Sequence, residues 1–179
     1  TISWFKERAI LSPTNEQVDK VNNLILSKID ASTQIYYSVD TVLDLEEAVH
    51  FPTEFLNSLN PSGLPPHKMV LKVSCPVILL RNLNPPKLCN GTRLLVKSLK
   101  TFIIECIILT GCGTEEDVLI SRIPLIPLDL PFQFKRLKFP VKTSFAMTIN
   151  KSQGQTFNVV GLDLSVECFS HGQLYVALS

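Results

Sequence analysis

The hydrophobic and polar positions follow an α/β pattern at the start of the chain. Residues 8–14 predict a short strand that runs into a turn. Thr14 and Gln17 then have the spacing of a capping box, in which a threonine hydroxyl caps the first turn of a helix. Apolar side chains recur in that helix at intervals of three and four residues and predict its buried face, formed by Val18, Val21, Ile25 and Ile29.

The pattern changes in the middle of the chain. Residues 33–40 alternate and predict a second strand, and a weaker helical pattern covers residues 46–59. The proline-rich segment 60–66 marks a boundary, after which short strands follow with no room for helices between them: 69–73, 77–83, 92–99, 102–109 and 118–123. Asn90 and Gly91 mark a tight hairpin turn between two of these strands. Several short strands in about 60 residues predict a small closed β-barrel.

An α/β pattern returns near the end of the chain. Residues 141–147 are apolar and predict a buried strand, residues 159–164 predict another, and a helical pattern begins at His171. We therefore expect an α/β fold in which a discontinuous α/β domain carries the barrel as an insertion, with segments at 1–65, 66–130 and 131–179.

Basic side chains occur at two places where their role is open. Residues 131–140 interleave basic and aromatic side chains. They form either a nucleic-acid surface, with rings for stacking and cations for phosphate, or a hairpin whose rings pack inward while the cations face water. Arg81 and Arg93 lie on predicted barrel strands, where they either touch DNA or belong to a solvated face.

Composition narrows the class of protein. The chain is 45% hydrophobic, which supports a real core, and its 12 prolines against 7 glycines do not fit a flexible linker. The five cysteines are odd in number and show no C-x-x-C pair, so we expect reduced thiols in an intracellular protein and no metal site. No apolar stretch approaches the ~18–20 residues of a membrane span. Residues 1–60 carry four Lys or Arg against nine Asp or Glu, and residues 61–179 carry thirteen against seven, so a polyanion would be attracted to the second part.

The polar loop after the strand at 141–147 is the main candidate binding site. A strand that ends in such a turn presents backbone N–H groups at the carboxyl edge of a sheet, where open α/β sheets bind ligands. The loop offers a cation, two hydroxyls and a glycine that lets backbone donors come close, a combination that suits phosphate: Lys151, Ser152, Gly154, Gln155 and Thr156. A strand followed by a solvated loop is the alternative.

Four segments of the chain together resemble the C-terminal motor half of the Pif-type superfamily-one DNA helicases, and most of all the helicase modules of Helitron transposons. Residues 9–22 (AILSPTNEQVDKVN) resemble helicase motif IV, and residues 75–84 (CPVILLRNLN) with 88–93 (LCNGTR) form the second segment. Residues 145–156 (FAMTINKSQGQT) resemble motif V, and residues 171–179 (HGQLYVALS) resemble motif VI.

The resemblance implies a second RecA-like domain, of the P-loop NTPase type, with an inserted small Src-homology-like β-barrel. In such motors ATP binds between two RecA-like domains, and single-stranded DNA runs across both. By motif position, the nucleotide would face Gly154 and Gln155, and DNA would contact Thr14, Asn15, Thr148, Asn150, Lys151 and Ser152. Family members usually carry histidine where this chain has Asn150, which keeps a hydrogen-bonding group but lacks a ring for stacking on a base.

Two motif features bear on enzymatic activity. The sequence contains no G-x-x-x-x-G-K-[ST] loop to cradle the phosphates of ATP with Mg²⁺. The arginine finger that the family places in motif VI would follow Ser179. We therefore expect one part of a longer, monomeric, ATP-dependent DNA helicase whose first RecA-like domain precedes Thr1, and we expect this part alone to be inactive.

The resemblance also implies 5′→3′ unwinding in replication, repair, recombination, or telomere or transposon DNA metabolism. The corresponding location is the nucleus or, as a second option, the mitochondrion. The alternative function is a stand-alone nucleic-acid-binding or adaptor module derived from such a helicase, without ATPase activity.

Overall fold

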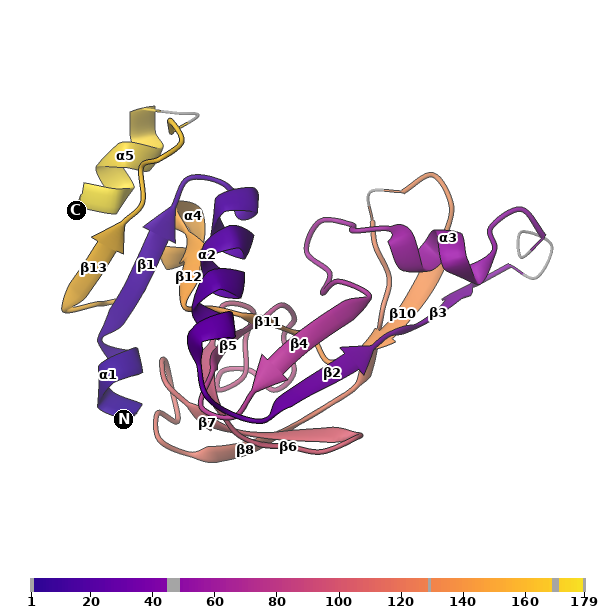
Figure 1. The fold of residues 1–179 in the computed structure, drawn as a ribbon, viewed down its shortest axis with the longest axis horizontal. Coiled ribbons are helices and arrows are strands. Elements are labelled where there is room, and N and C mark those ends of the chain that lie inside the picture. Colours follow the sequence, from indigo (N-terminus) through magenta and orange to yellow (C-terminus); the bar gives the residue numbers. More distant parts are fainter. Residues whose placement is uncertain (1, 45–48, 129, 169–170, 179) are drawn as a thin grey trace.

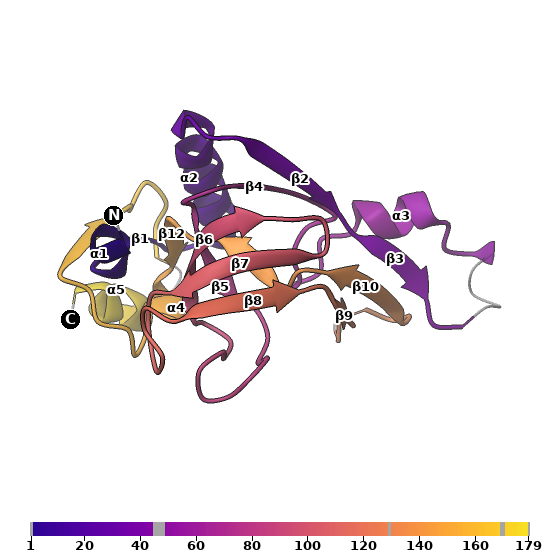
Figure 2. The ribbon, with the colours of Figure 1, turned by 90° about the horizontal axis from the view of Figure 1, so that it is seen from below.

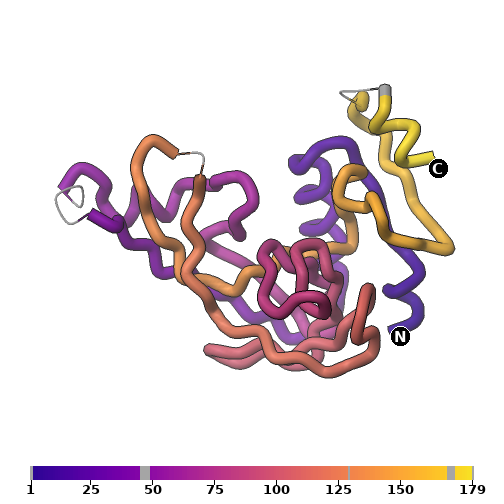
Figure 3. Tube along the Cα trace, turned by 180° about the vertical axis from the view of Figure 1, so that it is seen from behind, coloured from indigo at the N-terminus to yellow at the C-terminus, as the bar shows by residue number. Residues whose placement is uncertain are grey.

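The computed structural model describes residues 2–44, 49–128, 130–168 and 171–178. A parallel α/β layer lies at one end of the molecule, an antiparallel sheet lies in the middle, and an arm extends at the opposite end (Figure 1). Both chain ends lie on the side of the α/β layer (Figure 3). Residues 46–48 of the predicted weak helical region, and Ser179 at the end of the motif VI segment, lie outside the described residues.

The α/β layer contains a three-stranded parallel sheet built from both ends of the sequence. Its central strand is β1 (Arg8–Ser12), which pairs with β12 (Ala146–Thr148) on one side and with β13 (Val159–Leu162) on the other. The helices of this layer are α1 (Ile2–Lys6), α2 (Asn15–Lys28), α4 (Ile149–Ser152) and α5 (His171–Leu178). A parallel sheet assembled from the first and last segments is consistent with a RecA-like fold.

Helix α2 begins where its cap predicts but buries a different face. Thr14 is its N-cap, and the Thr14 hydroxyl accepts a hydrogen bond of 3.4 Å from the backbone N–H of Gln17. The buried row is Val18, Asn22 and Leu26, whereas three of the four side chains of the predicted stripe are only partly buried: Val21, Ile25 and Ile29.

The polar member of the buried row, Asn22, explains this difference. Its Nδ2 donates to the carbonyl oxygens of Thr143 (3.0 Å) and Ala146 (3.1 Å), and its Oδ1 accepts from the backbone N–H of Ala146 (2.8 Å). The amide thus satisfies polar groups at the start of β12, so an asparagine is stable in a row where the hydrophobic pattern counts only apolar residues.

The middle of the molecule is a five-stranded antiparallel sheet (Figure 2). Its strands in order are β11 (Val141–Thr143), β5 (Pro76–Leu79), β6 (Arg93–Leu99), β7 (Ile103–Ile108) and β8 (Asp117–Ser121). Alternate side chains of these strands form the larger core, including Val77, Leu94, Ile104, Cys106 and Ile108. The short strands predicted in this region all exist, although the one expected at 77–83 ends at Leu79.

Strand membership differs from the predicted barrel in two ways. The first predicted barrel strand, β4 (Lys68–Lys72), pairs with β2 (Thr33–Tyr37) and not with the five-stranded sheet. In addition, the single strand expected at 141–147 is divided between two sheets. Its first half, β11, pairs antiparallel with β5, and its second half, β12, pairs parallel with β1.

The chain crosses from one sheet to the other between Ser144 and Phe145. The backbone N–H of Ser144 donates to Pro76 O (2.9 Å), beside the five-stranded sheet, whereas the carbonyl of Phe145 accepts from the N–H of Ile10 (3.2 Å) in the parallel sheet. An apolar run predicts a buried strand without showing which partner each half finds, so the prediction of one continuous strand was wrong.

The arm contains a second three-stranded sheet with a helix beside it. Strand β10 (Phe134–Lys138) lies between β3 (Val39–Val42) and β9 (Ile123–Leu125), and α3 (Thr53–Ser58) contacts β3. Pairing of β3 with β10 therefore joins the first predicted segment to the third, and pairing of β9 with β10 joins the second to the third. The predicted domain boundaries remain predictions.

Neither interpretation of residues 131–140 holds for Arg136 and Lys138, two of the three basic residues on β10. Phe134, Arg136 and Lys138 share one face of the strand, and all three are fully buried. The Arg136 guanidinium donates to Asp40 and to three backbone carbonyls, while Lys138 Nζ donates to the carbonyl oxygens of Tyr36 (2.8 Å) and His67. These partners allow the cations to occupy the inward face.

Two further observations concern the described residues alone. All five cysteines are free there. No helix in the described ranges combines the length and the apolar character that a membrane crossing requires.

Candidate nucleic-acid and nucleotide interface

The carboxyl edge of the parallel sheet gathers the residues predicted to bind DNA. Ser12 at the end of β1 lies opposite Thr148 at the end of β12, so the two strands end side by side. Helix α2 begins just after β1, and α4 begins just after β12, at the same edge (Figure 1). Thr14 and Asn15 from the first segment are thereby brought to the edge that also holds Thr148 and Asn150.

The predicted loop after β12 begins with one short helical turn, α4. Thr148 occupies its N-cap position, and within the described residues the Thr148 side chain makes no capping hydrogen bond. Asn150 and Lys151 are exposed on this turn, as is Asn15 at the start of α2. Ser152 is only 8% exposed, and its hydroxyl donates to the carbonyl oxygen of Ile149 (2.7 Å).

Gly154 and Gln155 close the turn that follows α4. Gly154 has a φ of +80°, and a Cβ there would meet no atom of the described residues within 4 Å. Backbone conformation and not space therefore favours glycine at this position. Gln155 N donates to Ser152 O (2.9 Å), and Gln155 Nε2 donates to Lys151 O (3.1 Å) and Gly91 O (3.4 Å). Its Oε1 is buried and has no hydrogen-bond partner in the described part of the chain.

A carboxylate that the sequence did not single out lies on the other side of β1. Asp163 follows β13, its N–H donates to Leu11 O (2.8 Å), and its Oδ2 accepts from the Ser12 hydroxyl (3.3 Å). Hydrogen bonds from Ser165 hold the pKa of the Asp163 carboxyl below its usual value. The anionic side of the edge is therefore at β13, and the cation Lys151 lies on the β12 side, where a phosphate would meet less repulsion. Asp163 lay inside the strand predicted at 159–164, whereas β13 ends at Leu162, so the strand pattern did not mark Asp163 as an edge residue.

Helix α5, which contains most of the motif VI segment, is tied to the turn after β1. Gln173 is 3% exposed, and its Nε2 donates to Pro13 O (2.9 Å). No sequence pattern predicted this contact, because it joins two segments that are far apart along the chain. Gln173 thereby links the motif IV segment to the motif VI segment.

Arg93 neither faces water nor is available to DNA. It is 1% exposed, and its guanidinium donates to Phe5 O (3.1 Å) and Arg8 O (3.2 Å), so it joins β6 to the start of the parallel layer. Burial lowers the pKa of Arg93 to about 10. Arg81 donates to Gly63 O (3.1 Å) and Leu80 O (2.9 Å), so it connects the residues after β5 to the segment before β4.

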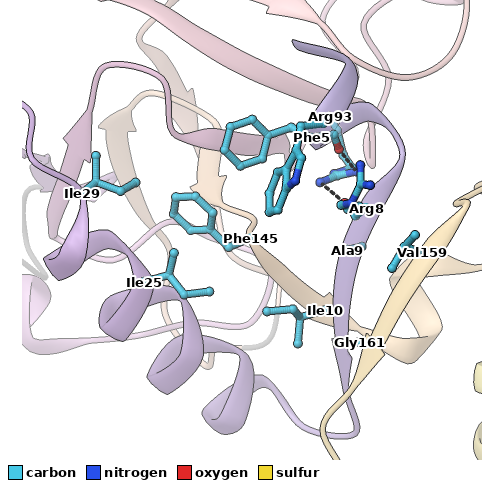
Figure 4. A pocket seen from close by; sticks show the side chains of 11 residues that line it. Phe5, Arg8, Ala9, Ile10, Ile25, Ile29, Arg93, Phe145, Val159 and Gly161 are labelled. Carbon is cyan, nitrogen blue, oxygen red and sulfur yellow. Dashed lines mark hydrogen bonds between the residues drawn. The ribbon is translucent and has the colours of Figure 1, made fainter. Parts of the chain in front are cut away.

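A largely apolar cavity of about 330 Å³ lies between α1, α2 and the parallel sheet (Figure 4). Trp4, Phe5, Ile25 and Phe145 contribute to its walls. Arg8 and the opposing Val159 also line it, so it lies at the amino ends of β1 and β13. Its lining contains none of the residues predicted to bind DNA or nucleotide.

Comparisons with known proteins agree on one family. The family profile described as "DNA helicase Pif1, 2B domain" matches residues 54–99, which contain β4, β5 and β6. The ATP-dependent DNA helicase Pif1 of Bdellovibrio bacteriovorus is 28% identical over 169 residues, covering 94% of this chain. The crystal structure of Pif1 helicase from Candida albicans covers 96% of this chain at 25% identity, with a TM-score of 0.70. The chain matches the C-terminal part of a Pif1-type helicase.

A third comparison concerns the fold alone. Bacteroides Pif1, in a crystal structure bound to ssDNA, covers 96% of this chain with a TM-score of 0.70 and 23% identity. The chain spans about a third of the Bdellovibrio protein (36%), 42% of the Candida chain and 38% of the Bacteroides chain. The predicted Pif1-type resemblance and the RecA-like fold with a small β-barrel-like insertion are confirmed. The narrower likeness to Helitron modules stays a prediction.

Proposed function

We propose that this chain supplies the C-terminal motor part of an ATP-dependent DNA helicase, which holds single-stranded DNA at the carboxyl edge of the parallel sheet. The observation that carries this proposal is the register of Ser12 opposite Thr148, since it brings two separate helicase-like segments to one edge. Open α/β sheets bind ligands at such an edge. The Bacteroides relative bound to ssDNA supports the choice of ligand.

The exposed residues of this edge would contact DNA directly. Lys151 would neutralise a phosphate, and the amides of Asn15 and Asn150 would donate to phosphate or sugar oxygens. The Thr148 hydroxyl, free of a capping role within the described residues, would donate as well. The hydroxyls of Thr14 and Ser152 already make local hydrogen bonds, so Thr14 would act mainly by holding the start of α2 and Ser152 by holding the helical turn α4.

We propose that Gly154 and Gln155 complete an ATP site against an upstream first RecA-like domain. Among the described residues the Oε1 of Gln155 has no donor, and this supports the role, because a buried acceptor without a donor is costly unless a ligand or a second domain satisfies it. Among the described residues, no three His, Cys, Asp or Glu side chains gather in a group that could hold a metal ion. By the resemblance, the Mg²⁺ that accompanies ATP would take its ligands from the first domain and from the ATP phosphates.

The remaining features of the proposal come from the resemblance. The complete helicase is a monomer that unwinds DNA 5′→3′ in replication, repair, recombination, or telomere or transposon DNA metabolism. It works in the nucleus, with the mitochondrion as the second location.

The test is ATP hydrolysis by the full-length native protein that contains this sequence, with and without single-stranded DNA. We expect DNA to stimulate hydrolysis, and we expect Lys151→Ala to weaken DNA binding and lower the slope of log affinity against log salt by about 0.7. Lys68→Ala, which removes an exposed lysine on β4, serves as the control. DNA binding without any hydrolysis would favour the adaptor alternative, and an unchanged salt slope for Lys151→Ala would contradict the phosphate contact.

A further inference from the structure

We propose that the β5–β6 loop of the barrel-like insertion, residues 80–92, is a positioning element for the DNA and nucleotide residues of the motor edge. In this arrangement Asn90 orients Lys151, and the carbonyl group of Gly91 holds Gln155. The inference rests on the proposed function of that edge. It assigns a role there to residues outside the parallel layer.

Hydrogen bonds within the β5–β6 loop fix the backbone of its last residues. Asn82 Oδ1 accepts from the N–H of Asn90 (2.7 Å), and the N–H of Gly91 donates to Leu79 O (2.9 Å) at the end of β5. Leu88 and Asn84 form a small antiparallel bridge, and Leu88 is buried against the main core. The backbone at 90–91 is therefore set by the barrel-like insertion before any ligand binds.

The first contact between this loop and the motor edge restrains the candidate phosphate cation. Lys151 Nζ donates to Asn90 Oδ1 at 3.0 Å, and both side chains are otherwise exposed. A lysine ammonium has three donors, so a bond to Asn90 leaves two for a phosphate. An exposed lysine samples many rotamers, and ordering one such side chain before binding changes affinity by about two- to tenfold.

The second contact restrains the candidate nucleotide residue. Gln155 Nε2 donates to Gly91 O at 3.4 Å and to Lys151 O at 3.1 Å, so one amide group bridges the β5–β6 loop and the α4 turn. Both amide hydrogens of Gln155 are thus engaged, and its buried Oε1 accepts no hydrogen bond from the described residues. Two consecutive loop residues thus hold the two residues assigned to DNA and nucleotide, and a shift of the insertion would displace both.

A double-mutant cycle on the full-length helicase tests this role. The dissociation constant for a fluorescent single-stranded oligonucleotide is measured for the wild type, Asn90→Ala, Lys151→Ala and the double variant. Asn84→Ala is the matched control, because it removes an exposed asparagine from the same loop. We expect Asn90→Ala to weaken binding about two- to tenfold, Asn84→Ala to have no effect, and the double variant to bind as Lys151→Ala does.

The outcomes separate this inference from the proposed function. If Lys151→Ala leaves DNA binding unchanged, the assignment of the edge to DNA fails. If Lys151→Ala weakens binding but Asn90→Ala behaves like Asn84→Ala, only the positioning role is overturned. Tighter binding by Asn90→Ala would also overturn it, because the contact would then compete with DNA. If the two losses of affinity add in the double variant, Asn90→Ala acts independently of Lys151. That result would indicate general damage to the loop and would overturn the orientation of Lys151 by Asn90.

Discussion

The buried ion pair in the arm gives the largest predicted effect of a single substitution. Arg136 and Asp40 have fully buried side chains, and the Arg136 Nη2 to Asp40 Oδ2 distance is 2.7 Å. The same guanidinium also donates to three carbonyl oxygens at 3.0–3.1 Å, which belong to Leu56, Leu59 and Pro65. Asp40→Ala would leave a buried positive charge without its counterion.

Such a loss costs about 3–5 kcal/mol of unfolding free energy. Because domains are stable by only about 5–15 kcal/mol, this is a large fraction of the total. It corresponds to a fall in melting temperature of roughly 6–20 °C for a chain of this size. Urea denaturation followed by circular dichroism measures the free energy, and a thermal melt measures the temperature.

An exposed ion pair supplies the control. Lys97 and Asp117 approach to 2.9 Å with both side chains about half exposed or more, so Asp117→Ala should cost less than about 1 kcal/mol. The double variant Asp40→Leu with Arg136→Met should recover part of the loss, since it removes the unpaired charge but leaves three carbonyls without their donor. If Asp40→Ala costs no more than Asp117→Ala, the argument from burial is wrong.

Three further predictions concern stability. Burial, and to a lesser extent the nearby Arg136, lowers the pKa of Lys138 from 10.5 to about 7. Above pH 7 the unfolded chain therefore binds more protons than the folded chain, and the unfolding free energy should rise by up to about 1.4 kcal/mol per pH unit. Urea midpoints at pH 7 and 8.5 should show this rise, and the same rise in Lys138→Met would contradict the assignment to Lys138. Asn22→Ala should cost about 1–3 kcal/mol because it strips buried backbone groups of their partners, whereas a similar loss for the exposed Asn23→Ala would refute that explanation. Gly154→Ala should lower stability by about 1–2 kcal/mol through its positive φ, and an unchanged melting temperature would show that the turn relaxes.

Local signals predicted the elements well. The Thr14 cap, the start of α2 and the short strands of the middle sheet depend on side chains close together in sequence, and each is found. Pairing depends on residues far apart, and there the sequence was a poor guide. Nothing in residues 141–147 distinguishes the half that pairs with β5 from the half that pairs with β1.

The same limit applied to individual polar side chains. Both interpretations of residues 131–140 left the cations exposed, because cations ordinarily face water. The buried carbonyls that accept from Arg136 and Lys138 could not be foreseen from the sequence. For the candidate site, the motifs identified residues that the structure brings to one edge, and their contacts with DNA remain predictions. Asn90 and Gly91 belong to one of the segments that carry the resemblance, but their contacts with Lys151 and Gln155, about 60 positions away, could not be predicted from that segment.

The divided parallel sheet has a consequence for the order in which the chain folds during synthesis. Ile10 pairs with Ala146, so β1 waits for a neighbour that is 136 positions later (146 minus 10). At about 5–20 residues per second, a ribosome needs roughly 7 to 27 seconds to supply it. The strands of the middle sheet from β5 to β8 pair with close neighbours in sequence and can form within that delay. The insertion would therefore fold first and hold the two ends of the chain near each other, and the motor layer would close around it last.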